Sequence, residues 1–227
     1  METPPPGPLR SSFYEQLDQI RLQVELMGVR VDQNLERMRE VLHTGDEKVA
    51  ATALDADDDI DAMHVSLLER CYDVLGRESP VASDLRFVVS VVRILSELER
   101  VGDLSLRVVK LAPLVPSLRQ AGEAWDVLLT LVDTAVEQYR TALRAWSAQD
   151  LGLAAELADH PAPLSSFHER LVSSVQARDR AEAVQLAMAM FVISQSADRI
   201  ADHAAIIGAR LRYLLTGEPS HLAAEVR

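Results

Sequence analysis

Residues 86–111 read RFVVSVVRILSELERVGDLSLRVVKL, and this stretch decides the fold class. Its first ten residues, 86–95, are rich in β-branched side chains, which favour strands. The apolar periodicity then continues through SELERVGDLSLRVVKL at residues 96–111. Because a long pattern of this kind is typical of an amphipathic helix, we predict a helix here rather than a strand.

The composition of the whole chain also favours helices. Of the 227 residues, 48% are hydrophobic, only 4% are aromatic and nine are glycine. Leu, Ala, Val, Arg, Glu and Asp dominate, which predicts an all-α globular protein with a sizeable core. The single cysteine excludes an internal disulfide, and no apolar run reaches the roughly 18 residues that a membrane span needs.

The charge of the chain argues against nucleic acid as a partner. The net charge is −12, and the sequence has no basic stripe that could bind phosphate groups of DNA or RNA. The first ten residues, METPPPGPLR, lack the apolar centre of a signal peptide. We therefore expect a cytosolic protein with a disordered, proline-rich tail over residues 1–11.

Helical periodicity and capping signals predict six long helices. The first begins near Phe13, and start signals follow at Asp46, at Ser79 with Pro80, at Ser117 with Gln120, at Asp150, and at Asp179 with Glu182. Breaks are expected at Gly45, at Gly76, at Pro113 and Pro116, near Ala148, and at Gly217. We expect two antiparallel three-helix bundles at residues 12–113 and 117–217, with a carboxy-terminal tail at 218–227.

A short motif occurs twice and supports an internal duplication. ELERVGD at residues 97–103 is matched by SADRIAD at 196–202, so Glu99 and Asp103 in the third helix correspond to Asp198 and Asp202 in the sixth. Acids at i and i+4 share a helix face and usually form a solvated pair. Here, however, the apolar stripe of the third helix leads directly into them, which predicts core positions for these acids.

Counting along the helices places further acids beside this motif. In a hairpin that turns near residue 78, Asp57 and Glu99 each lie 21 residues from the turn and therefore at one level. Asp61 and Asp103 fall within about a turn of that level, and the same count about the preceding turn adds Asn34. Polar groups from three helices are thus expected to converge.

Carboxylates gathered without a lysine are destabilising unless they are protonated, hydrated or bound to a cation. A metal ion is the simplest answer. Ligands that are all oxygen favour magnesium, manganese or iron over a structural zinc.

Other candidate residues have structural interpretations that compete with functional ones. His64 is a possible ligand but more often such a histidine is a hydrogen-bonded core residue, and His168 sits at the matching position of the second half. We expect Cys71 to be a buried thiol. Met188 and Met190 are expected to pack between helices, and His43 and His203 to lie at the periphery. Arg100 and Arg199 are expected to form surface ion pairs at least as readily as they would act as ligands.

Three stretches resemble the PhoU family of phosphate-signalling regulators. They are ADDDIDAMHVSLLERC at 56–71, SPVASDLRFVVSVVRILSELERVGD at 79–103 and ADRIADHAAIIGARLRYLLTG at 197–217, and with the segment around Met27 and Gly28 they span nearly the whole chain. The resemblance implies two similar three-helix bundles. It also implies multinuclear metal clusters, most often of iron and sometimes of zinc, manganese or other ions. The residues that match are Glu99, Asp103, Asp57, Asp61, Asp198 and Asp202.

The second half departs from this family pattern. An offset of 104 residues sets Pro161 and Ser165 opposite Asp57 and Asp61, so two acids are missing. The segment DHPAPL should also break or kink the fifth helix. Counting from a turn near residue 179 places His160 opposite Asp198 and Glu156 opposite Asp202, which keeps a substituted site possible.

The resemblance implies a non-enzymatic regulator that represses the phosphate-starvation response when phosphate is plentiful. Its partners would be the ATPase of the phosphate ABC transporter and a membrane-bound sensor histidine kinase, and the family also suggests a homodimer. One alternative is a ferritin-like carboxylate di-metal enzyme, for which Glu40 with His43 fits the Glu-x-x-His pattern and Asp61 with His64 nearly does. The level of residue 40 lies about 16 Å from Asp61 along the bundle, which argues against it. A second alternative is a metal-free helical interaction module.

Overall fold

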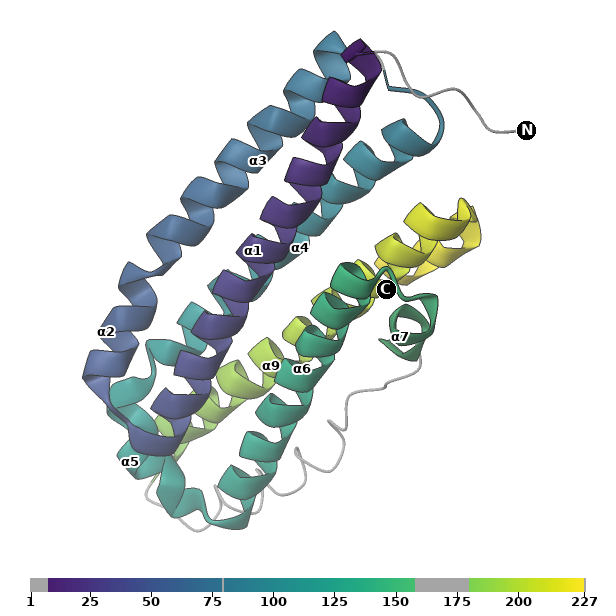
Figure 1. Ribbon diagram of the computed structural model, residues 1–227. Coiled ribbons are helices and arrows are strands. Elements are labelled where there is room, and N and C mark those ends of the chain that lie inside the picture. The colour runs from purple at the N-terminus through teal and green to yellow at the C-terminus, as the bar shows by residue number, and fades with distance from the viewer. Residues whose placement is uncertain (1–7, 79, 158–179, 227) are drawn as a thin grey trace.

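The computed structural model describes residues 8–78, 80–157 and 180–226, and all the regular elements in these ranges are helices (Figure 1). The first half contains α1 (Pro8–Thr44), α2 (Glu47–Asp55), α3 (Asp57–Arg77) and α4 (Ser83–Val109). The connection consists of η1 (Ala112–Leu114), α5 (Val115–Leu118) and η2 (Arg119–Ala121). The second half contains α6 (Glu123–Ala148), α7 (Leu151–Glu156), α9 (Arg180–Thr216) and η4 (Pro219–Val226). The predicted all-α class is confirmed.

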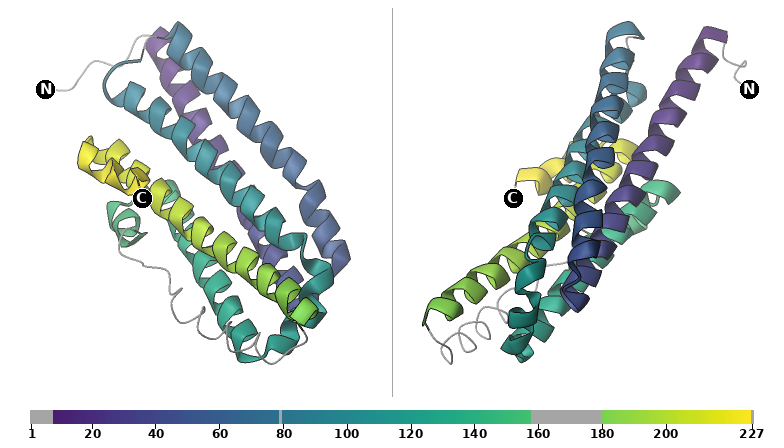
Figure 2. Two further views of the ribbon diagram at one scale, coloured as in Figure 1. Left: turned by 180° about the vertical axis from the view of Figure 1, so that it is seen from behind. Right: turned by 90° about the vertical axis from the view of Figure 1, so that its left-hand side faces the viewer.

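The helices of the two halves pack into one continuous core. α1, α3 and α4 form a three-helix bundle. From the second half, α6 packs against α1 and α9 packs against α4, and Figure 2 shows α9 beside α4 from behind. Buried side chains from both halves, such as Leu95 of α4 and Ile200 of α9, belong to one hydrophobic cluster. The expected division into domains at residues 113–117 therefore stays a prediction.

Two predicted helix starts are confirmed by their capping hydrogen bonds. The side chain of Asp46 accepts a hydrogen bond of 2.7 Å from the backbone N–H of Lys48. Asp150 accepts hydrogen bonds from the N–H groups of Gly152 and Leu153, at 2.7 and 3.1 Å. Each bond satisfies an N–H group that the first helical turn leaves without a partner.

Three other predicted boundaries were wrong. The predicted second helix is divided at Ala56 into α2 and α3. The predicted third helix begins at Ser83 rather than at Pro80, because the residue before it, Ala82, has a non-helical φ of 48°. The fourth helix begins at Glu123, since Ser117 lies inside α5 and Gly122, with φ of 60°, interrupts the backbone. Of the fifth helix only α7 lies within the described residues, so the expected break at DHPAPL falls outside them.

α1 and α6 approach each other closely at Gly28. A Cβ atom on this residue would lie 2.4 Å from Cδ2 of Leu143, so only glycine fits without a shift of the leucine. The fully buried Tyr139 donates a hydrogen bond of 2.9 Å from its hydroxyl to the Gly28 carbonyl. This contact joins the two halves in their interior.

Ion pairs reinforce the same contact at its edge. Arg140 of α6 contacts Asp32 and Glu36 of α1, each at 2.8 Å, and Arg39 of α1 contacts Asp133 of α6 at 2.7 Å. None of the described helices has an apolar stretch long enough to cross a bilayer.

Candidate functional site

Four of the predicted acids gather where α3 meets α4. Asp57 lies in the first turn of α3, and Asp61 follows one turn later on that helix. Oδ1 of Asp57 is 3.6 Å from the position that a Cβ of Gly102 would occupy, so α3 passes directly over the ELERVGD motif of α4. Glu99 and Asp103 of this motif both act electrostatically on Asp57.

The repulsion among these carboxylates appears in their pKa values. Burial, followed by the charges of Asp61 and Asp103, raises the pKa of Asp57 to about 6. Burial and Asp103 also raise the pKa of Glu99, while His64 acts in the opposite direction. The four side chains are therefore close enough to repel one another. Their role as metal ligands stays a prediction.

The expectation that the motif acids occupy core positions was wrong in part. Asp57 and Glu99 are half-buried, whereas Asp61 and Asp103 are exposed. Leu95 lies one turn before Glu99 on the same face of α4 and is fully buried, so the apolar stripe of this helix leads into acids that are only half-buried or exposed. The acids line the surface seam between α3 and α4.

The predicted contribution of Asn34 from the first helix was also wrong. Asn34 is fully buried, and its amide donates a hydrogen bond of 3.3 Å to the carbonyl of Ala53. Its side-chain oxygen accepts a hydrogen bond of 2.7 Å from Nη1 of Arg37. Asn34 therefore ties α1 to the end of α2, close to the break at Ala56, and is already satisfied.

His64 supplies an unsatisfied nitrogen beside the acids. Its Nε2 atom is buried and has no hydrogen-bond partner among the residues that the structure describes. The ring is close enough to Glu99 to affect the pKa of that carboxyl group. Within the described ranges, however, no three His, Cys, Asp or Glu side chains form a ready-made metal-binding group.

The second pair of acids lies on α9 and faces α6. Asp198 is only 9% exposed, and neither of its carboxylate oxygens has a hydrogen-bond partner in the described part of the chain. Burial and the charge of Asp202 raise the pKa of Asp198 to about 6, although Arg199 opposes this shift. Asp202 itself is exposed. A small hollow between α6 and α9 is lined by Asp198 together with Gln138.

Most of the positions compared with the first site lie outside the described residues. They are His160, expected opposite Asp198, together with Pro161, Ser165 and His168. Glu156 is exposed on α7. The substituted second site therefore stays a prediction.

Glu97, the first residue of the ELERVGD motif, is a buried carboxylate that the sequence pattern did not predict. Its side chain is fully buried between α4 and α9, and Oε2 lies 2.5 Å from Nδ1 of His203. Arg93 and Arg100 of α4 lie 3.0 and 4.0 Å from Oε1. The peripheral position predicted for His203 was therefore wrong, because this ring lies between the two halves.

The comparisons with known proteins agree with this architecture. The family model described as the PhoU domain matches residues 24–112. The chain is 24% identical to the phosphate-specific transport system accessory protein PhoU homolog 1 of Thermotoga maritima over 208 residues, covering 91% of this chain and 90% of the relative. Residues 24–112 are thus a PhoU domain, and the chain as a whole resembles PhoU proteins.

Other PhoU proteins extend this comparison. The Escherichia coli protein is 31% identical over 150 residues, which cover 58% of this chain and 62% of the relative. The crystal structure of PhoU from Pseudomonas aeruginosa is similar with a TM-score of 0.84 and 25% identity, covering 91% of this chain and 100% of that one. The PhoU structure from Streptococcus pneumoniae has a TM-score of 0.77 at 22% identity, with coverages of 91% and 98%, and supports the fold alone.

The part matched by the PhoU-domain model contains the first group of acids. Residues 24–112 include Asp57, Asp61, Glu99 and Asp103, whereas Asp198 and Asp202 lie beyond the match. The similar structures nevertheless cover most of the chain. Both copies of the acid motif therefore lie on the central helices of one PhoU-like fold, α4 and α9.

The remaining candidates have mainly structural surroundings. Cys71 is fully buried as expected, and burial raises the pKa of its thiol to about 11. Met190 is buried, but Met188 is 59% exposed among the described residues, so the packing role predicted for it was wrong. His43 is exposed as expected, and so are the side chains of Arg100 and Arg199.

Proposed function

We propose that this chain is a non-enzymatic accessory protein that represses phosphate uptake and the phosphate-starvation response when phosphate is plentiful. The observation that carries the proposal is its likeness, over 91% of its length, to a protein named as an accessory protein of the phosphate-specific transport system. In this proposal the chain acts in the cytoplasm as a homodimer. It binds the ATPase of the phosphate ABC transporter and a sensor histidine kinase, and so couples uptake to signalling.

The surface of the molecule supports action through protein contacts. Exposed apolar side chains occur on both α1 and α3, for example Leu22 at 58% and Val65 at 56%. On α1, Leu22 is followed by the exposed Leu26 and Val29 at i+4 and i+7, and a contiguous apolar stripe of this kind is typical of surfaces that bind other proteins.

We further propose that the acid groups bind a metal ion. Four carboxylates at the α3–α4 seam, and the unsatisfied Nε2 of His64 beside them, offer the oxygen and nitrogen donors that iron, manganese or zinc accept. Magnesium would use the carboxylates alone. The residues that would hold the ion are Asp57, Asp61, Glu99 and Asp103, and in the second half Asp198 and Asp202. A bound cation would neutralise the mutual repulsion of these carboxylates.

The regulatory role is tested by deleting the gene. With phosphate in excess, we expect transcription of phosphate-scavenging genes to rise in the deletion strain and to return to the repressed level on complementation. Relatives named homolog 1 and homolog 2 indicate that some organisms carry more than one such protein. The experiment therefore includes a strain that also lacks any paralogue, and continued repression in that strain refutes the proposal.

The metal proposal is tested by elemental analysis of protein purified without a chelator. We expect stoichiometric metal in the wild type and its loss in Glu99→Ala/Asp103→Ala. The variant Asp198→Ala/Asp202→Ala reports on the second site. Glu40→Gln/Asp126→Asn removes two exposed acids elsewhere and should keep the metal. A wild type that stays metal-free after supplementation with iron, manganese, zinc or magnesium refutes metal binding but leaves the regulatory proposal standing.

The two alternatives make different predictions. A ferritin-like enzyme would oxidise added ferrous iron, but Glu40 and His43 are exposed and do not contribute to the electrostatics of Asp57 or Glu99. A metal-free interaction module would keep the fold and its protein contacts while binding no metal. Ferrous-oxidation assays and the elemental analysis separate these alternatives from the main proposal.

A further inference from the structure

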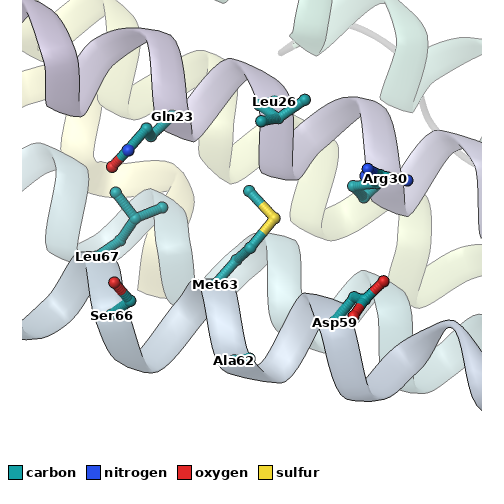
Figure 3. A pocket seen from close by; sticks show the side chains of 8 residues that line it. All are labelled: Gln23, Leu26, Arg30, Asp59, Ala62, Met63, Ser66 and Leu67. Atoms are coloured by element: carbon teal, nitrogen blue, oxygen red, sulfur yellow. The ribbon is translucent and has the colours of Figure 1, made fainter.

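A groove runs between α1 and α3 on the face of the first bundle shown in Figure 3. Its volume is about 480 Å³. The groove is lined by Gln23, Leu26 and Arg30 of α1 and by Asp59, Ala62, Met63, Ser66 and Leu67 of α3. A hydrogen bond between the side chains of Arg70 and Gln23 closes one end, and Arg30 and Asp59 stand on opposite walls at the other end (Figure 3).

The α1 wall continues as an exposed apolar stripe. Leu22, Leu26 and Val29 are 58%, 50% and 42% exposed, and they follow one another at i, i+4 and i+7. α1 also has a fully buried stripe that includes Met27 and Val31, so this helix is apolar on two faces. Since only the buried stripe is used by the bundle, the exposed one is available for another helix.

The α3 wall is acidic where the groove opens. Asp58 and Asp59 are exposed in the first turn of α3, and Asp55 is exposed at the end of α2. No ion pair involves any of these three acids within the described part of the chain. The residues that line the groove include one cation, Arg30, and one anion, Asp59, so the excess negative charge at this end comes from Asp55 and Asp58 beside the groove.

We propose that this groove binds an amphipathic helix of a partner protein. The apolar side of that helix would lie on Leu22, Leu26 and Met63, and its lysine or arginine side chains would face Asp58 and Asp59. The charge complementarity selects a basic helix, and anchors at i, i+4 and i+7 are the usual spacing for a helix bound in a groove. This inference rests on the proposed function, in which the chain acts by binding other proteins.

Two other occupants fit the groove less well. A small molecule is usually enclosed over most of its surface, whereas Leu26 is half exposed and both walls open to solvent. A second copy of the chain would bring its own groove acids towards the same acids in a symmetric contact, which is repulsive.

The inference is tested by fluorescence anisotropy with two labelled peptides and purified full-length protein. Each peptide is a helix of about 18 residues with leucines at i, i+4 and i+7. One carries lysines on its flanks and the other carries glutamates at the same positions. We expect the lysine peptide to bind wild-type protein at least about ten-fold more tightly than the glutamate peptide.

Matched variants locate the binding. Leu26→Glu should weaken binding of the lysine peptide about ten-fold, whereas Val81→Glu, at a position 67% exposed before α4, should leave it within about two-fold. Asp58→Asn/Asp59→Asn should reduce the preference for lysine and its dependence on salt. Glu40→Gln/Asp126→Asn removes the same charge elsewhere and should change neither the preference for lysine nor the dependence of binding on salt. Circular dichroism confirms that each variant is folded.

Equal binding of the lysine peptide to the wild type and to Leu26→Glu refutes the inference. A second result would also refute it. If the wild type dimerises in a concentration-dependent way, as measured by sedimentation, and Leu26→Glu abolishes this dimerisation, then a second copy of the chain occupies the groove. The assay uses purified protein, so its failure is distinguishable from a failure of the phosphate-repression phenotype in cells.

Discussion

The replacement Asp57→Asn tests the electrostatic account of the α3–α4 seam. The carboxyl group has a pKa of about 6 in the folded protein, raised from 3.8 by burial and by the neighbouring acids. Because the folded pKa is the higher one, the folded state keeps this proton when the unfolded chain has already lost it. The free energy of unfolding therefore falls as the pH rises between about 4 and 6. A shift of this size corresponds to about 3 kcal/mol, and solvent screening of a half-exposed group reduces it to about 1–2 kcal/mol.

The asparagine variant should lose this pH dependence. In EDTA at about pH 7.5, we expect Asp57→Asn to be more stable than the wild type by about 1–2 kcal/mol, with a smaller difference at about pH 4.5. Urea unfolding followed by circular dichroism measures both values. Asp126→Asn is the matched control. Asp126 also lies in the first turn of a helix, so its replacement removes the same favourable interaction between a carboxylate and the helix dipole.

The same variant also tests the metal proposal. A cation that binds the folded protein stabilises it by mass action, so added manganese should reverse the order and favour the wild type. A variant that is less stable than the wild type in EDTA at pH 7.5, or that keeps the wild-type pH dependence, refutes the reasoning about repulsion at this seam.

Three further predictions concern the contacts between the two halves, and each is checked by urea unfolding. Gly28→Ala should destabilise the protein by about 1–3 kcal/mol because its Cβ would meet Leu143, and the effect should largely vanish in a Leu143→Ala background. Tyr139→Phe should lower the free energy of unfolding by about 1 kcal/mol through loss of a buried hydrogen bond, and an unchanged value contradicts this geometry. Glu97→Gln should lower it by about 2 kcal/mol because His203 loses its charged partner, and a neutral effect shows that the pair contributes nothing net.

Features that depend on neighbouring residues in the chain could be predicted from the sequence. The apolar periodicity identified the long helices, and the caps at Asp46 and Asp150 were recognised because a side chain and the N–H groups it accepts from are only two or three residues apart. The level of Asp57 beside Glu99 followed from the rise of a helix and the position of one turn. These predictions needed no knowledge of how the two halves pack.

Boundaries that depend on tertiary contacts could not be predicted. The break at Ala56 occurs where Asn34 of α1 donates to Ala53, and a contact across 19 residues leaves no local signal. Ser117 and Gln120 match a capping box, but the chain uses this region for α5 and η2 and begins the long helix only after Gly122. A local propensity was overridden there by the path that the connection takes between the halves.

The buried charge of Glu97 on α4 could not be predicted from apolar periodicity. Periodicity identifies one apolar stripe per helix, but α4 is covered by α1, α3 and α9 and therefore has buried positions on several faces. Glu97 lies on the face towards α9, where the corresponding residue of the second motif is Ser196. His203, which accompanies Glu97, in turn corresponds to Leu104 of the first motif. The two copies have thus diverged in a complementary way, one supplying the carboxylate and the other the imidazole. Such a pair becomes recognisable only when α4 and α9 are packed antiparallel, so the divergence between the copies, rather than their similarity, marks where the two halves meet.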